Sequence, residues 1–226
     1  MRLYCYGTGS KGNHYILEAD NGEKLAIELG IKYNEIMTHF DLDKTVGILL
    51  SHHHKDHDYG KNVEKLKILG LPMLMPETVK LNEKYDLGSF QVIPIEAIHN
   101  VECISFLIKS DNKVILFATD TNFIPKIRGV KIDTMICEVN HIQHRSIEVL
   151  SGYERDEYYH LLMSYNNHMG LETMCKYLSN LDYKVKKFLV IHYSTTPAFD
   201  KEEAIMELNE LCESVEIVEK GKDYEI

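Results

Sequence analysis

The chain has 226 residues, 44% of them hydrophobic, which suffices for one sizeable core, and we expect residues 1–226 to form one domain. Its 35 acidic and 25 basic residues give a formal charge of −10 at pH 7, which opposes non-specific binding to long duplex nucleic acid. Five scattered cysteines favour buried thiols in a reducing compartment over a disulfide framework. Without a signal-peptide pattern or an apolar run of membrane-spanning length, the sequence predicts a cytoplasmic protein with no membrane contact.

The chain opens with strands. We expect short strands over residues 2–6, 14–19 and 24–29, the last two joined by the turn residues ADNGEK, in an antiparallel arrangement. Residues 46–50 form a continuous apolar run, as expected of a buried central strand. Helical spacing resumes after Gly60.

Further strands and helices follow along the rest of the chain. Strand patterns cover residues 73–75, 90–98, 103–108, 114–118, 134–139 and 188–192. Helical patterns cover residues 153–165, 171–180 and 201–212. Runs of strands interrupted by helices favour a layered α/β sandwich with its sites on the strand-end loops.

Four histidines and two aspartates follow the central strand, in the stretch LSHHHKDHDYG at residues 50–60. His52 and His54 are two residues apart, which sends both imidazoles to one side of an extended backbone. Asp56 and His57 follow at once and can serve a second centre, so the spacing suits two adjacent metal ions. A solvated histidine-rich loop is the alternative, and the strand–loop–helix context argues against it.

Three more donors follow buried strands. His99 ends QVIPIEAIH, Asp120 ends KVILFATD and His192 ends KKFLVIH. Taken singly, a histidine at a strand end is more often a hydrogen-bonded structural residue. Taken jointly, the three would reach the same edge of the sandwich as the first cluster and complete a binuclear site.

Imidazole and carboxylate ligands without a thiolate suit two divalent metal ions, with zinc as the first candidate and manganese, iron or nickel as alternatives. Such a pair produces a bridging hydroxide at neutral pH, and the second ion stabilises the charge that develops on the leaving group. The expected chemistry is hydrolysis without a covalent intermediate.

The pattern SHHHKDHDYG, followed by His99, Asp120 and His192, resembles the metallo-β-lactamase superfamily and implies its four-layer αββα sandwich. The opening GTGSKGNHYILEADNGEKLAIELG and the segment ILFATDTN resemble the same superfamily, so the resemblance covers nearly the whole chain. Within it, the segments CEVNH, NNHMGLETMCKYL and LVIHYS are most similar to the nuclease and phosphodiesterase branches, especially YycJ-like proteins and, more distantly, tRNase Z.

The resemblance implies a role for each donor. One metal ion would be bound by His52, His54 and His99, the other by Asp56, His57 and His192, with Asp120 bridging both. His168 would help to protonate the leaving group and Glu138 would orient it, although His168 is equally well interpreted as a loop histidine. Asp56 is counted among the catalytic residues as well as the ligands.

Several positions depart from the family pattern. Glu28, in IELG, replaces an aspartate that orients a metal-binding histidine, which puts metal affinity or metal choice in question. Asn100 stands where many relatives have aspartate, and NHMG replaces a Gly-His-Leu-Ser sequence. We interpret four other histidines as non-ligands: His14, His53, His141 and His144. Of these, His141 is expected to line the cleft.

The resemblance and the two-metal chemistry favour a phosphodiesterase or nuclease, acting on a nucleotide or a short, single-stranded nucleic acid. Side chains on either side of the last strand could contact phosphate, although a lysine run is usually a solvated face: Lys184, Lys186, Lys187, Ser194, Thr195 and Thr196. A lactone, thioester or β-lactam hydrolase with the same metal pair is the alternative, as is a metal-binding domain without activity. Monomer and homodimer are both left open.

Overall fold

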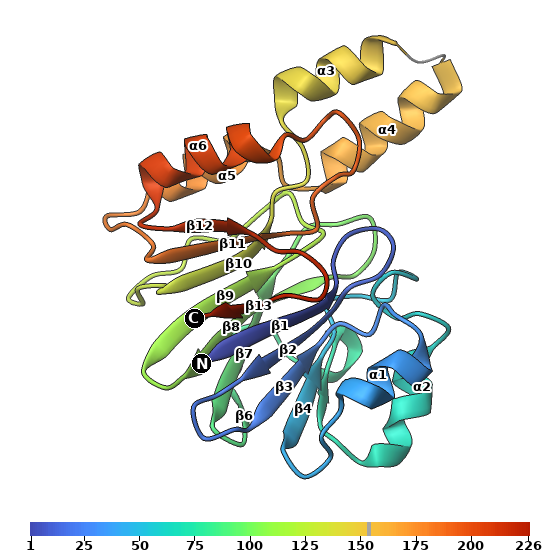
Figure 1. The fold of residues 1–226 in the computed structure, drawn as a ribbon, viewed down its shortest axis with the longest axis vertical. Helices are drawn as coiled ribbons and strands as arrows, with labels where there is room; N and C mark the ends of the chain where they lie inside the picture. The colour runs from blue at the N-terminus through green and yellow to red at the C-terminus, as the bar shows by residue number, and fades with distance from the viewer. Residues whose placement is uncertain (153–154) are drawn as a thin grey trace.

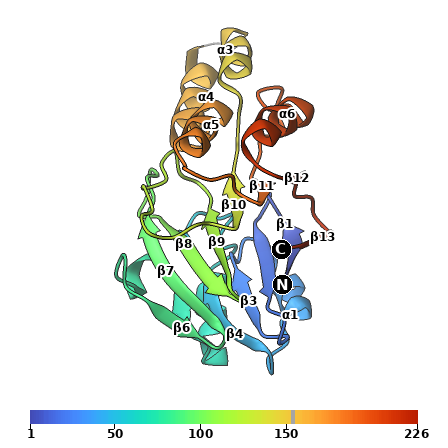
Figure 2. The same cartoon turned by 90° about the vertical axis from the view of Figure 1, so that its left-hand side faces the viewer.

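The computed structural model describes residues 1–152 and 155–226, with the backbone alone at 155–157, 160 and 164. Two β-sheets face each other, and helices lie outside them, so the layers run helix, sheet, sheet, helix (Figures 1 and 2). This is the four-layer αββα sandwich that the sequence predicts. Among the described residues, no helix combines the length and the apolar character needed to span a membrane.

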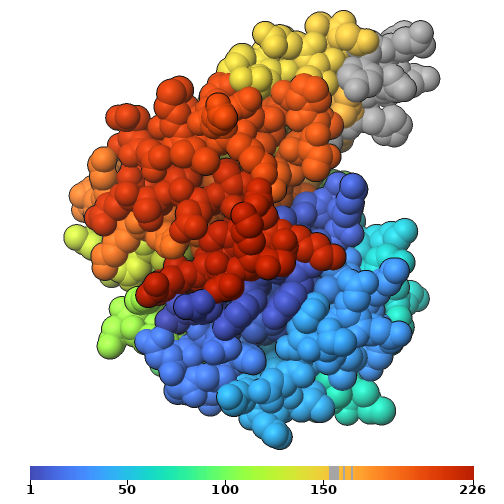
Figure 3. All heavy atoms as spheres, in the orientation of Figure 1, coloured from blue at the N-terminus to red at the C-terminus, as the bar shows by residue number. Residues whose placement is uncertain are grey.

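The first sheet has the strand order β13-β1-β2-β3-β4-β5. Its strands are β1 (Arg2–Gly7), β2 (His14–Glu18), β3 (Lys24–Ile27), β4 (Thr45–Leu49), β5 (Met73–Leu74) and β13 (Asp223–Glu225). The pairs β1–β2 and β2–β3 are antiparallel, which confirms the expected opening, while β3, β4 and β5 pair in parallel. Figure 3 shows the C-terminal residues lying along the first strand, where β13 pairs with β1.

Two short helices, α1 (Tyr33–His39) and α2 (Asn62–Leu66), cover the outer face of this sheet (Figure 1). They bury Ile36, Val63 and Leu66 against the outward side chains of the strands, among them Ile16 and Ile48. Two 3₁₀ turns follow, at Lys67–Leu69 and Pro76–Thr78.

The second sheet has the order β12-β11-β10-β9-β8-β7-β6. Its strands are β6 (Tyr85–Leu87), β7 (Phe90–Glu96), β8 (Ile104–Ser110), β9 (Lys113–Ala118), β10 (Thr134–Glu138), β11 (Lys187–Ile191) and β12 (Val215–Ile217). The strands β6 to β9 are antiparallel, and β9 to β12 are parallel. Parallel strands end at one sheet edge, so the residues after β9, β10 and β11 meet there.

Four helices accompany the second sheet. They are α3 (Gln143–Ser151), α4 (Arg155–Asn167), α5 (Leu171–Ser179) and α6 (Lys201–Leu211). Helices α5 and α6 cover its outer face, whereas α3 and α4 stand as a pair beyond the sheet edge (Figures 1 and 2). Of the helix expected over residues 153–165, residues 153 and 154 lie outside the described part, and α4 accounts for the rest.

The core between the sheets is built from the inward side chains of both. Fully buried aromatic and aliphatic groups interdigitate there: Tyr15, Leu17, Ile27, Leu49, Phe106, Phe117, Ile136 and Leu189. The rings of Tyr15 and Phe117 meet edge to face, with centroids 5.7 Å apart, and so join the two sheets. Several expected boundaries differ from the observed ones by one or two residues. At the site, β7 ends at Glu96 instead of residue 98, so His99 lies in a loop.

Candidate metal centre

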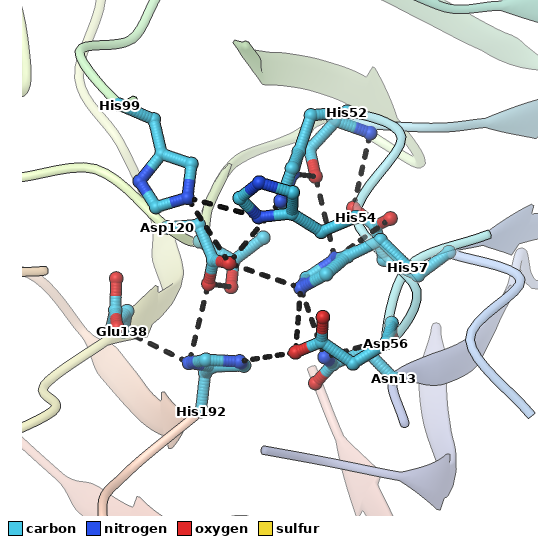
Figure 4. A network of polar contacts seen from close by, with 12 residues as sticks. Asn13, His52, His54, Asp56, His57, His99, Asp120, Glu138 and His192 are labelled. Carbon is cyan, nitrogen blue, oxygen red and sulfur yellow. Dashed lines mark hydrogen bonds and ion pairs between the residues drawn. The ribbon is translucent and has the colours of Figure 1, made fainter. Parts of the chain in front are cut away.

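Four strand ends converge at one edge of the sandwich and position the candidate ligands. The loop after β4 carries His52, His54, Asp56 and His57, while Asp120 follows β9 by two residues and His192 follows β11 directly. His99 lies in the loop between β7 and β8. Figure 4 shows all seven side chains pointing into one small volume.

The first group of donors comprises His52, His54, His99 and Asp120, whose donor atoms all lie within 4.8 Å of one another. His52 Nε2 lies 3.4 Å and His99 Nε2 3.8 Å from Asp120 Oδ2. His54 Nδ1 lies 3.3 Å from His99 Nε2. Three imidazole nitrogens and one carboxylate oxygen therefore face a common point.

The second group comprises Asp56, His57, His192 and, again, Asp120. His57 Nε2 lies 3.2 Å from Asp120 Oδ2 and 3.6 Å from Asp56 Oδ2. His192 Nε2 lies 3.4 Å from Asp56 Oδ2. Because Asp120 belongs to both groups, its carboxylate lies between them.

Neighbouring groups hold the imidazoles in place through their other nitrogens. Ser51 Oγ lies 2.9 Å from His52 Nδ1, and the Asn167 carbonyl lies 3.1 Å from His99 Nδ1. His57 Nδ1 lies 3.1 Å from Glu28 Oε2. Contacts of this kind fix the orientation of a metal-binding histidine. The longer side chain of Glu28 thus still reaches the histidine that the shorter aspartate of the family pattern is expected to orient.

Three residues of the site have left-handed backbone conformations, although none is glycine. The φ angles are +61° at Glu28, +49° at Asp120 and +49° at His192. Such conformations are uncommon for residues with a side chain and persist where the surrounding structure enforces them. Each of the three follows a β-strand closely, so the turn redirects the side chain into the site.

A second carboxylate–histidine pair adjoins the centre. Glu138, the last residue of β10, is buried, and its Oε1 lies 2.5 Å from His168 Nδ1 and 3.2 Å from His192 Nδ1. His168 Nδ1 also lies 3.8 Å from Asp120 Oδ1. Glu138 therefore connects a ligand candidate, His192, to a histidine that stands just outside both donor groups.

These four residues also form a third set of close donors, Asp120, Glu138, His168 and His192. In that set the nitrogens of His168 and His192 nearest to Glu138 are the Nδ1 atoms. His192 then keeps only Nε2 free, and that nitrogen belongs to the second group. The third set is accordingly a hydrogen-bonded relay and not a further ion site.

The electrostatics of the site favour a cation. Burial lowers the pKa of His57 and His192, but the Asp120 carboxylate and its neighbours outweigh burial, raising the pKa of His192 to about 10 and that of His57 well above its usual range. Burial lowers the pKa of His99 to about 4, so this imidazole is neutral and its lone pair is available. Carboxylates that raise the pKa of two neighbouring imidazoles favour positive charge at this centre.

The residues fit divalent ions on a structural observation as well. His52 Nε2 is buried and has no hydrogen-bond partner among the described residues. It lies 3.4 Å from Asp120 Oδ2 without forming a hydrogen bond to it, which an ion between the two would explain. Histidine and aspartate donors suit zinc and other first-row metals.

The four histidines interpreted as non-ligands lie outside both donor groups. His14 is fully buried, 2.6 Å from the Glu28 carbonyl, and His53 is exposed beside Asp58 and Glu77. His144 is exposed and faces Glu203. His141 lines a groove next to His168, in agreement with its expected place in the cleft.

Of the two interpretations of the lysines near β11, the structure favours the solvated face over contact with phosphate. Lys187 begins β11, whereas His192 follows its other end, so the strand separates the lysines from the site. Lys186 pairs with Asp133 at 2.7 Å, and Lys187 pairs with Glu216 at 2.7 Å. Ser194 lies at the correct end, where its hydroxyl bonds that of Thr196.

Two polar residues of the site were not predicted. Asn13 Nδ2 lies 3.0 Å from His57 Nε2 and donates to the Asp56 carbonyl at 3.1 Å (Figure 4). Thr8 Oγ1 accepts a hydrogen bond from the backbone N–H of His192. Both belong to the glycine turn GTGSKGN, and its glycines were the available signal that this backbone approaches another segment closely.

Solved structures show the same fold. The metallo-β-lactamase fold protein YhfI from Bacillus subtilis is 16% identical, with a TM-score of 0.69 and 99% of both chains covered. A diphosphatase from the PhnP family is 16% identical, with a TM-score of 0.63 over 99% of this chain and 97% of that one. Human tRNase Z, short form, is 12% identical, with a TM-score of 0.62 over 100% and 99%.

No family model and no curated protein sequence matches the chain. The structural likeness nevertheless extends over whole chains. Together with the two sheets and their flanking helices, it shows that the chain has the metallo-β-lactamase fold, as its sequence pattern predicts.

Proposed function

We propose that the protein is a binuclear metal-dependent phosphodiesterase that acts on a nucleotide or a short, single-stranded nucleic acid. The donor groups that share Asp120 support two ions, and we assign His52, His54 and His99 to one and Asp56, His57 and His192 to the other. Zinc is the first candidate. Two such ions supply an activated water and neutralise charge on the phosphate oxygens.

The observation that carries this proposal is the Glu138–His168 pair beside the donor groups. Burial lowers the pKa of His168, but the nearby Glu138 and Asp120 carboxylates outweigh it and raise that pKa. The imidazole therefore stays protonated closer to neutral pH. With Nδ1 occupied by Glu138, Nε2 remains to donate a proton to a departing oxygen.

This arrangement suits a phosphodiester better than a thioester. An alkoxide is a poor leaving group and gains much from a positioned acid, whereas a thiolate leaves readily without one. The structures of a PhnP-family diphosphatase and of tRNase Z support the assignment through their fold. All five cysteines are free, which suits the cytoplasm, where we place the protein.

The test is the dependence of His168→Ala on the leaving group. On bis-p-nitrophenyl phosphate, whose leaving group needs no acid, the variant should retain much of its activity. On a dinucleoside monophosphate it should lose about a hundredfold or more in kcat, the usual contribution of general acid catalysis. Glu138→Gln should show a weaker loss of the same kind. Both variants should keep their metal content.

His144→Ala is the matched control, because His144 is exposed and lies outside both donor groups. It should match the wild type on both substrates. Equal losses for His168→Ala on the two substrates would refute the acid role. Wild-type protein that cleaves a lactone or a thioester but no phosphodiester would instead support the alternative hydrolase.

A further inference from the structure

A groove of about 550 Å³ opens beside His168. Its walls are α3, α4 and the start of α5, together with the residues that follow β7 and β9. Its size lies within the range of about 300–1,000 Å³ that is typical of small-ligand sites. His168 belongs to its lining, so the groove and the proposed acid share a wall.

The groove is tied to the metal centre by hydrogen bonds at the end of α4. Asn122, two residues after Asp120, donates to the Asn166 carbonyl at 2.5 Å. The Asn167 carbonyl lies 3.1 Å from His99 Nδ1. The last turn of α4 is thereby fixed to two ligand-bearing loops, and the groove keeps its place on the side of the site where His168 stands.

Apolar and polar side chains share the lining. Phe123 and Ile147 are partly exposed in it, although both are large apolar residues. The rings of His141 and Tyr165 lie against each other, with centroids 4.9 Å apart. The exposed ring of Phe123 is of the kind that stacks with nucleobases.

The polar groups of the groove suit a neutral ligand. His141 is 8% exposed, and its Nδ1 has no hydrogen-bond partner within the described part of the chain. Glu172 is the acidic residue of the lining, and no lysine or arginine occurs in the described lining. A further phosphate placed here would meet negative charge without a cation, whereas a nucleobase amine would meet an acceptor.

We propose that this groove binds the leaving group of the reaction and that this group is a single nucleoside without further phosphates. The assignment rests on the proposed function. As the oxygen of water bonds to phosphorus, the P–O bond to the nucleoside breaks and His168 gives its proton to the departing oxygen. The nucleoside leaves as a neutral alcohol, and the proton lost by water passes to solvent, which reprotonates His168.

Nucleoside binding to the metal-loaded protein tests the groove without requiring turnover. Calorimetric titration with adenosine, cytidine, guanosine and uridine should show binding of at least one. Phe123→Ala removes a stacking surface, and Thr173→Trp fills the groove from an exposed position on α5. Each should weaken that binding about tenfold or more, the cost of losing one base–aromatic stack.

Met206→Ala and Met206→Trp are the matched controls, because Met206 is 60% exposed on α6 and lies outside the groove. Both should bind the nucleoside like the wild type, and inorganic phosphate should bind all five proteins equally. The assignment would be overturned if no nucleoside bound, or if Phe123→Ala and Thr173→Trp bound the nucleoside as tightly as the wild type.

A kinetic comparison tests the preference for an unphosphorylated leaving group. The wild type should cleave the dinucleotide ApA with a kcat/KM roughly tenfold higher than whichever of pApA and ApAp carries its extra phosphate on the leaving nucleoside, which the products of ApA cleavage identify. Equal values would overturn that preference. If nucleosides bind but neither compound is cleaved, the proposed function fails while the ligand class of the groove stands.

Discussion

At the scale of single residues, the site depends on one carboxylate. Asp120 lies within 4 Å of His52, His57, His99 and His192, and it belongs to both donor groups. Its left-handed backbone is of a kind that aspartate tolerates better than most residues. No other described residue is common to the two groups proposed to hold metal.

Replacement of this carboxylate should affect both ions. We expect Asp120→Asn to lower the metal content from about two ions toward zero and to abolish hydrolysis, since the amide keeps the shape and removes the charge. His54→Ala removes a donor of the first group only and should leave about one ion. Elemental analysis after dialysis measures the metal content of both variants, and circular dichroism reports whether the fold persists.

His144→Ala serves as the control here too and should keep the wild-type metal content. If Asp120→Asn kept two ions, the shared carboxylate would not be a ligand.

Sequence alone was sufficient to bring the seven ligand candidates together, because each follows a readable apolar run. His99 shows how far that reasoning extends. The strand β7 ends at Glu96, three residues before His99, yet the loop that follows still places His99 beside His54. Asn13 and Thr8 were missed because their contacts depend on how a turn meets a loop distant in sequence. Glu138 came from family resemblance alone, since nothing in an apolar strand indicates which side chain it will meet.

At the scale of elements, the glycine turn after β1 supports the ligand loop. Asn13 donates its backbone N–H to the Asp56 carbonyl at 2.8 Å, and Gly30 donates to the Asn13 carbonyl at 2.8 Å. A Cβ at Gly30 would lie 1.7 Å from the Asp56 carbonyl oxygen. The three segments pack backbone against backbone, which leaves no room for a side chain.

Gly30→Ala should therefore displace the loop that carries Asp56 and His57. We expect a loss of about 1–3 kcal/mol in stability, the usual cost of overpacking, together with weaker metal binding. Thermal denaturation and competition with a chelating dye measure the two effects.

The control is Gly152→Ala, where the new Cβ would meet no described atom nearer than the Val149 carbonyl oxygen at 3.6 Å. It should change neither quantity appreciably. Wild-type metal affinity in Gly30→Ala would show that the close packing of Gly30 against Asn13 and Asp56 does not position the loop.

The elements that the sequence did not reveal share a physical cause. Strands β6, β12 and β13 have three residues each, too few for an alternating pattern to stand out. Helix α1 spans seven residues, with Ile36 as its buried anchor, and α3 has only Ser146 and Leu150 buried. The longer strands around the site were predicted because their burial is nearly continuous, as in β10 and β11.

At the scale of the whole molecule, each proposed ion joins the two sheets. The loop after β4 of the first sheet supplies His52 and His54 to one group and Asp56 and His57 to the other. The remaining donors come from the second sheet and its loops. Bound metal thus adds links between layers that otherwise meet through the apolar core.

Metal should consequently raise thermal stability. At a free zinc concentration a hundredfold above the dissociation constant, each bound ion adds about 2.7 kcal/mol. For a domain of this size that corresponds to a rise of roughly 5–10 °C in Tm per ion. Scanning calorimetry of zinc-loaded and chelator-treated protein measures it, and magnesium, which prefers oxygen donors, should give a smaller rise.

Asp120→Asn provides the reference, because its Tm should respond little to zinc. A wild-type Tm independent of zinc would mean that no ion links the sheets.

The division of the donors between the sheets also sets an order of events as the chain folds. Small zinc modules gather their ligands from neighbouring residues, so metal can organise them from the start. Here neither group is complete until the loop after β4 packs beside the strand ends of the second sheet. The second group also needs His192, which follows β11. We therefore expect high-affinity metal binding to follow the packing of the two sheets. A partly folded chain should bind the same ions more weakly.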